Sequence, residues 1–138
     1  HLGLTPQYVH ALSGYQLQGK TQTTASKLIA DALAVEAAGA YAIVLELIPR
    51  ELSELVTSQL SIPTIGIGAG PSCDGQVQVI HDILGLYNDF VPKHTKQYCN
   101  LSNIAVSALR EYSLEVSQGI FPSQTNSFSM PQGELPSV

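Results

Sequence analysis

Residues 41–49 read Tyr-Ala-Ile-Val-Leu-Glu-Leu-Ile-Pro, and this stretch decides the fold. Five uncharged residues lead into Glu46, and Pro49 follows three positions later. A short continuous apolar run is typical of a strand that is buried on both faces, as parallel strands are. Proline suits the first turn of a helix, where its missing N–H costs nothing. We therefore expect Glu46 at the carboxyl end of a buried parallel strand, just before the next helix.

That position makes Glu46 a candidate catalytic residue, because ligands bind at the carboxyl edge of parallel α/β sheets. Loss of water there would raise the pKa of the carboxylate and make it a better base. A structural Glu46, paired with Arg50 or bonded to helix N–H groups, is the alternative. His1 also lies at the end of an expected strand, so it either faces the same site or is a terminal histidine of no consequence. The pattern leaves both pairs of alternatives open.

Composition excludes several classes of function. With 138 residues, 44% of them hydrophobic, the chain fits one domain with a real core. The formal charge is −5 and no basic cluster exists, so binding to nucleic acid or to an anionic membrane has no electrostatic support. No apolar run approaches the roughly 18 residues of a membrane span. Cys73 and Cys99 stand in no metal or redox spacing, which favours free thiols in a reducing, cytoplasmic compartment.

The rest of the chain alternates strands and helices. We expect a strand end over residues 1–7, a long loop over 8–23 and a second loop over 85–97. A further buried strand is expected over residues 62–67. The expected helices cover residues 24–38, 49–60, 75–84 and 100–118.

Turn and capping residues set the expected bounds of these helices. Thr23 or Thr24 can cap the first helix, and Gly39 stops it. Asp74 is the expected N-cap of the third helix. The expected core side of the last helix consists of Ile104, Leu109, Tyr112 and Val116.

Alternation of this kind predicts parallel strands joined by right-handed crossovers. About 120 ordered residues look like half of a (β/α)₈ TIM barrel, which typically takes about 250 residues. A smaller open α/β sheet is the structural rival. We expect residues 1–122 to form the partial barrel with its last helix and residues 123–138 to be a disordered tail. Because the chain opens on His1 without an initiator Met, we expect a fragment or a processed chain.

The glycine-rich segment Gly66–Gly70 follows one expected strand and precedes the next helix. Alternate glycines let a backbone approach a ligand and offer N–H donors, so a phosphate cradle is one interpretation. A tight turn with close strand–helix packing is the other. The segment does not match the dinucleotide-binding pattern, since Cys73 stands where a third glycine belongs. It does not match the Walker pattern either, since it has no Lys-Ser or Lys-Thr.

Other ionisable residues carry weaker hypotheses. Lys93 and His94 could meet an anionic substrate, or they could lie on a solvated loop. His81 and Asp82 are adjacent in an expected helix and so do not face one another. No nucleophile–base order and no metal-ligand spacing stands out.

Several blocks of the sequence together resemble ketopantoate hydroxymethyltransferase. They occur in register from residue 1 to about residue 122. The blocks are His1–Gln7, Gly14-Tyr15, Gln18-Gly19, Asp31–Ala34, Glu36–Ala40, Val44–Glu46, Ile62–Gly70, Asp74–Gln76 and His81-Asp82.

The resemblance implies the carboxyl-terminal half of a (β/α)₈ barrel. It implies transfer of a hydroxymethyl group from 5,10-methylenetetrahydrofolate to 3-methyl-2-oxobutanoate, giving 2-dehydropantoate on the route to pantothenate. It also implies Mg²⁺, a homo-oligomer that is often a decamer, Glu46 as general base and His1 beside the substrate. The acidic metal ligands are expected in the absent amino half, so a non-catalytic half-barrel that needs an amino-terminal partner remains an alternative. A phosphate-binding barrel enzyme that uses Gly66–Gly70 is another.

Overall fold

The computed structural model of the chain describes residues 1–8, 14–87 and 89–136. The long loop that we expect over residues 8–23 therefore lies partly outside the described residues. Ten elements follow one another along the chain. They are β1 (Leu2–Gly3), η1 (Pro6–Tyr8), α1 (Gln22–Ala37), β2 (Ile43–Glu46), α2 (Arg50–Gln59), β3 (Thr64–Ile67), β4 (Gly75–Gln76), α3 (Ile80–Ile83), α4 (Leu101–Ser117) and η2 (Gln124–Asn126).

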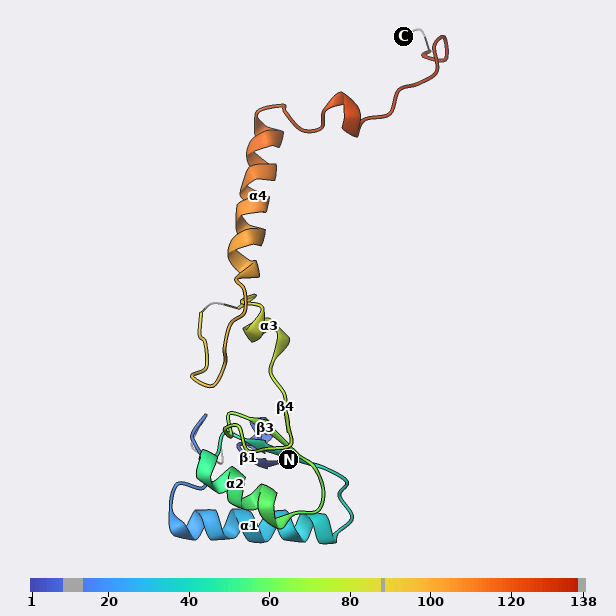
Figure 1. Cartoon of the computed structure of the whole chain (residues 1–138). Helices are drawn as coiled ribbons and strands as arrows, with labels where there is room; N and C mark the ends of the chain where they lie inside the picture. The colour runs from blue at the N-terminus through green and yellow to red at the C-terminus, as the bar shows by residue number, and fades with distance from the viewer. Residues whose placement is uncertain (9–13, 88, 137–138) are drawn as a thin grey trace.

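The four strands form one parallel sheet in the order β1-β2-β3-β4. Figure 1 shows α1 and α2 on the same side of this sheet. A doubly wound open sheet reverses its strand order and places helices on both faces. Sequential order with helices on one side is instead the arrangement of a (β/α)₈ barrel. The expected alternation of parallel strands and helices is confirmed, and the open-sheet rival has no support in the topology.

The core lies between the sheet and the two crossover helices. Ile43 and Leu45 of β2 are buried because alternate residues of a strand point to the same face. They pack with Leu52 and Val56 of α2, which lie one helical turn apart. The complete cluster consists of Leu28, Ala32, Ile43, Leu45, Ile48, Leu52, Val56 and Ala69. This core holds the carboxyl end of β2 in a fixed place.

The first helix begins two residues earlier than its sequence pattern predicts. The N-cap is Thr21, whose hydroxyl accepts a hydrogen bond from the Thr24 N–H at 3.2 Å. The Thr24 hydroxyl in turn accepts one from the Thr21 N–H at 3.0 Å, which completes a capping box. Thr23 therefore is not the cap, although Gly39 ends the helix as expected, with φ at 95°.

The third expected helix is mostly wrong. Residues 75 and 76 form β4, and α3 covers only Ile80–Ile83. Residues 76–79 alternate glutamine with the β-branched valine, a period that suits a strand. The Val77 N–H donates to the Gly66 carbonyl at 3.0 Å and extends the pairing with β3. Asp74 therefore caps no helix.

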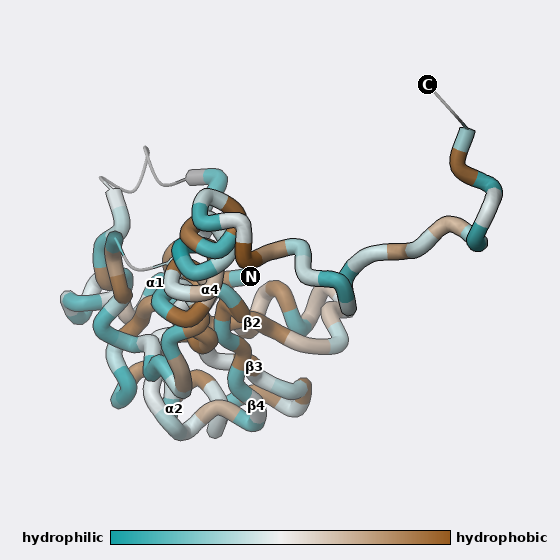
Figure 2. Tube along the Cα trace, turned by 90° about the horizontal axis from the view of Figure 1, so that it is seen from above, coloured by the Kyte–Doolittle hydropathy of each residue, from teal (hydrophilic) through white to brown (hydrophobic). Residues whose placement is uncertain are grey.

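The last helix lies where its period predicts, but its apolar side is not a core side in this chain. No residue of α4 is buried, and Ile104, Leu109, Tyr112 and Val116 are all exposed. Figure 1 shows α4 extending away from the sheet, and hydrophobic residues recur along its trace in Figure 2. Among the described residues, no helix is both long and apolar enough to cross a lipid bilayer.

Candidate active site

Three neighbouring segments fix the backbone at the carboxyl end of β2. The Glu46 carbonyl accepts a hydrogen bond from the Leu4 N–H, and the Leu47 N–H donates to the Ile67 carbonyl, both at 2.9 Å. The Leu47 carbonyl accepts from the Gln18 N–H, also at 2.9 Å. The side chain of Glu46 therefore leaves from a rigid part of the sheet edge.

Leu47 turns the chain sharply directly after Glu46. Its φ is 50°, and it is the one non-glycine residue with positive φ among those that the structure describes. The left-handed conformation costs an L-residue about 1–2 kcal/mol, and such strain gathers at functional sites. The chain then enters α2, for which Pro49 is the N-cap.

The carboxylate of Glu46 is paired with His1. The His1 Nε2 lies 3.0 Å from the Glu46 Oε2, and the two side chains are 34% and 18% exposed. Arg50 is engaged elsewhere, since its Nε donates to the Glu51 carboxylate at 2.8 Å. The structural alternative in which Arg50 neutralises Glu46 is therefore wrong. Both residues that the sequence singles out as site candidates meet at one point.

Glu46 also lines a cavity of about 590 Å³ above the sheet edge. The opposite wall is the segment from β4 to α4, so the cavity joins residues that are distant in the sequence. Lining residues are Leu4, Tyr15, Glu46, Leu47, Ile67, Val79, Asp82, Tyr87, Phe90, Pro92, Lys93 and His94. Such a space is large enough for a small organic substrate.

Two effects act on the protonation of Glu46. Burial raises the pKa of the Glu46 carboxyl, and the charge of His94 opposes this by lowering it. Burial prevails, so the pKa of Glu46 lies above its ordinary value. A carboxylate with a raised pKa is a stronger base at neutral pH.

The glycine-rich segment is closely packed. A Cβ on Gly70 would lie 2.4 Å from the Arg50 Cβ, and one on Gly66 would lie 3.0 Å from the Cys73 sulfur. The Gly70 carbonyl accepts a hydrogen bond from the Gln76 side chain at 2.9 Å. These contacts favour the tight-turn interpretation over a phosphate cradle.

The weaker candidates separate in the structure. Lys93, His94 and Asp82 line the cavity, whereas His81 does not. Asp74 has a structural role, because its carboxylate accepts from the Thr64 N–H at 2.8 Å and from the Thr64 hydroxyl at 3.0 Å. The sequence suggests His94 only as a contact for an anionic substrate or as a solvated residue, since only the fold reveals that it packs against Gly68.

No metal centre is formed by this chain alone as far as it is described. Within residues 1–8, 14–87 and 89–136, no three His, Cys, Asp or Glu side chains are grouped so that they could hold a metal ion. Cys73 and Cys99 are both free thiols. The described residues therefore do not by themselves fit the Mg²⁺ that the resemblance implies.

Comparison with known proteins identifies the family of this chain. The family model described as ketopantoate hydroxymethyltransferase matches residues 1–124. The chain belongs to the ketopantoate hydroxymethyltransferase family. Two relatives named 3-methyl-2-oxobutanoate hydroxymethyltransferase come from Dehalococcoides mccartyi and Clostridioides difficile, and are 58% and 52% identical over 135 residues. A third, from Geotalea uraniireducens, is 58% identical over 128 residues.

The ketopantoate hydroxymethyltransferase relatives are much longer than this chain. The D. mccartyi match covers 98% of the chain but 48% of the relative, and the C. difficile match covers 98% and 49%. The G. uraniireducens match covers 93% and 48%. The chain thus spans about half the length of the curated relatives it matches. With its sequential parallel sheet, this length makes the described fold one half of a barrel of the family.

Proposed function

We propose that this chain supplies the general base for transfer of a hydroxymethyl group to 3-methyl-2-oxobutanoate, giving 2-dehydropantoate in pantothenate biosynthesis. The observation that carries the proposal is the half-buried carboxylate of Glu46, which lines a cavity at the carboxyl edge of a parallel sheet. The names of the relatives supply the substrate and the reaction class.

The chemistry requires a positioned base. The proton on C3 of the substrate is weakly acidic because a ketone lies next to it. In our proposal Glu46 takes this proton, directly or through one water, and the C3–H electrons pass into the enolate. The enolate carbon then forms a bond to the methylene carbon of the donor, for which we propose 5,10-methylenetetrahydrofolate. Both bonds from that carbon to the folate nitrogens break, and water supplies the hydroxyl oxygen. Tetrahydrofolate leaves after its two nitrogens take up the proton from C3 and one proton from water. A raised pKa suits the base to this step.

We propose that His1 binds an oxygen of the substrate or of the enolate. Its Nε2 lies 3.0 Å from the carboxylate of Glu46. A substrate whose C3 is in reach of the base therefore brings its ketone close to this imidazole. Binding there would favour the charge that develops on oxygen as the proton leaves.

We assign the ligands of the implied Mg²⁺ to the amino-terminal half of the barrel. The residues described here include no suitable cluster. The test uses a completed barrel, which we define as this chain joined to the amino-terminal half of the D. mccartyi relative. A Mg²⁺ titration should give binding to the completed barrel and none to residues 1–138 alone. Equal binding by the isolated chain would contradict the assignment.

We further propose that the complete protein is a homo-oligomer, as the resemblance implies, in the form of a decamer. The exposed apolar residues of α4 support an interface between copies. We place the protein in the cytoplasm. The two free thiols fit a reducing compartment.

The proposed function is tested by Glu46→Gln in the completed barrel, with product formation followed by mass spectrometry. Removing a general base costs typically 10²- to 10⁴-fold in turnover, so kcat should fall by about that factor while the circular dichroism spectrum is kept. Glu54→Gln, on the exposed side of α2, is the matched control and should leave kcat unchanged. Unchanged turnover in the Glu46 variant would rule out its assignment as the base.

A further inference from the structure

The loop between α3 and α4 brings His94 into close contact with the sheet edge where Glu46 lies. A Cβ built on Gly68 would lie 3.0 Å from the Cγ and 3.1 Å from the Nδ1 of His94. The imidazole is therefore seated directly on the Gly68 backbone, in space that only a glycine leaves free. Gly68 also has a φ of 65°, which glycine adopts without strain.

Several other charged or titratable groups face Glu46 from the elements around it. His1 reaches it from the start of the chain before β1. Asp82 of α3 and Lys93 of the loop line the same cavity, as do the phenols of Tyr15 and Tyr87. His94 lines this cavity too, and its charge lowers the pKa of Glu46 that burial raises.

We propose that His94 is a positioning residue for Glu46: its imidazole, seated on Gly68, provides the positive charge that keeps the half-buried carboxylate ionised. It acts on the base through space and does not touch the reacting carbon. The inference rests on the proposed function, because it assigns a second residue to the same site. It also explains why a loop far along the chain returns to the sheet edge at Gly68.

The charge of His94 should affect how kcat/KM depends on pH. Imidazole is largely protonated at the pH where carboxylates titrate, so it opposes protonation of a nearby carboxylate. An opposite charge within a few ångströms lowers a carboxyl pKa by about 1–3 units, and removing it raises that pKa again. The acid limb of kcat/KM, which reports ionisation of the base in the free enzyme, should therefore move to higher pH when His94 loses its charge.

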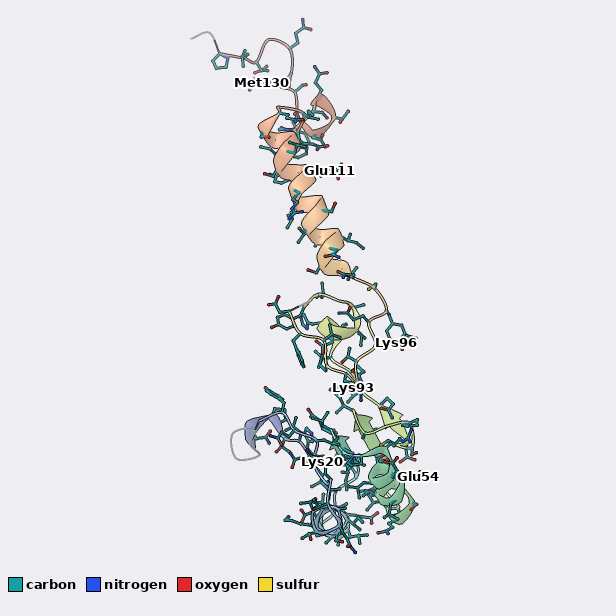
Figure 3. All side chains as sticks on the ribbon, turned by 90° about the vertical axis from the view of Figure 1, so that its left-hand side faces the viewer. Lys20, Glu54, Lys93, Lys96, Glu111 and Met130 are labelled. Atoms are coloured by element: carbon teal, nitrogen blue, oxygen red, sulfur yellow. The ribbon has the colours of Figure 1, made fainter. Side chains whose placement is uncertain are left out.

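The experiment compares four variants of the completed barrel. His94→Gln and His94→Phe remove the charge, and both should move the acid limb up by about 1 pH unit. Their loss of kcat/KM should be larger at acid pH than at pH 8, because Glu46 is ionised in every variant at pH 8. His94→Lys restores a cation and should return the limb towards its original position. Lys96→Gln removes a cation from the same loop, at a residue that Figure 3 places further from the sheet than Lys93, and should not move the limb.

A fifth variant tests the seat of the imidazole. Gly68→Ala places a methyl group against the ring of His94 and should displace it. The acid limb should then move up even though the histidine is still present. In the double variant Gly68→Ala with His94→Gln, the acid limb should lie no higher than in His94→Gln alone.

The outcomes separate this inference from the proposed function. If the completed barrel forms no product, or if Glu46→Gln keeps full turnover, the proposed function fails. If the barrel is active but the acid limb is the same in the parent, His94→Gln and His94→Phe, the inference is overturned. It is also overturned if Lys96→Gln moves the limb as far, or if all three His94 variants lose activity equally at every pH, which would indicate packing alone.

Discussion

At the scale of single residues, Leu45 and Leu47 flank the carboxylate but stabilise its position in different ways. Leu45 is fully buried in the core beneath the sheet. Leu47 lines the cavity and has left-handed backbone geometry. The first residue therefore contributes packing, whereas the second carries backbone strain that redirects the chain after Glu46.

This difference predicts that truncation at the two positions changes the free energy of unfolding by different amounts. Leu45→Ala should lower the free energy of unfolding of the completed barrel by about 2–5 kcal/mol, as other buried leucines do. Leu47→Gly should change it by less than about 1 kcal/mol, because relief of the left-handed strain offsets the lost contacts and the added chain entropy. Urea denaturation measures both values. A cost for Leu47→Gly as large as that for Leu45→Ala would show that Leu47 is not strained.

Local sequence predicts a residue's place in an element better than its partners. An apolar run followed by Glu46 is enough to place that residue at a strand end. The pairing of Glu46 with His1, and the contact of His94 with Gly68, depend on how distant segments meet. Likewise, no local pattern marks Leu47 as left-handed, since leucine rarely adopts that conformation.

At the scale of elements, a carboxylate joins the start of β3 to the segment before β4. Asp74 accepts two hydrogen bonds from Thr64, whose side chain is fully buried and also bonds the Thr57 hydroxyl at 2.9 Å. These bonds lower the pKa of Asp74 below its ordinary value. They replace the helix-capping role that the sequence suggests for this residue.

The lowered pKa predicts a sign for the pH dependence of stability. A carboxyl whose pKa is lower in the folded state contributes stability that is present above its unfolded pKa of about 4 and is lost as the pH falls through the folded value. Asp74→Asn should therefore lower the urea midpoint at pH 7 and make the midpoint less dependent on pH below 4. Glu54→Gln is the control. If Asp74→Asn lowered the urea midpoint equally at pH 7 and at pH 3, this would contradict an ionic role for Asp74.

The third expected helix shows where element prediction fails. Segment 75–79 is too short to distinguish a helix from a strand by its period, and two residues of β4 suffice to pair with β3. Pairing with an existing strand outweighs intrinsic helix preference there. The longer helices α1, α2 and α4 carry enough turns for their periods to be read, and all three occur within a few residues of their expected bounds.

At the scale of the whole molecule, α4 is the longest helix, and none of its residues is buried. Its apolar residues remain exposed in this chain, and the aromatic rings of Tyr112 and Phe121 contact one another with centroids 5.6 Å apart. A helix of 17 residues with an exposed apolar side requires a partner surface in the complete protein. In the homo-oligomer proposed above, that surface belongs to a second copy.

The assignment predicts an effect on assembly. Leu109→Glu with Val116→Glu places two charges on one side of α4, seven residues apart, and should shift the completed barrel to a smaller oligomer. Light scattering coupled to size-exclusion chromatography measures the mass. Asn103→Glu with Ser107→Glu adds the same charge on the opposite side and should leave the mass unchanged. Equal masses for all three proteins would contradict an interface through this side of α4.

The central claim is that Glu46 removes the proton from C3 of 3-methyl-2-oxobutanoate, and hydrogen exchange tests it without the folate. The completed barrel is incubated with the substrate and Mg²⁺ in D₂O, and the C3 proton is followed by ¹H NMR. The account predicts enzyme-dependent loss of that signal for the parent protein and for Glu54→Gln, and a rate lower by about 10²-fold or more for Glu46→Gln. Exchange by Glu46→Gln at the parent rate would contradict it.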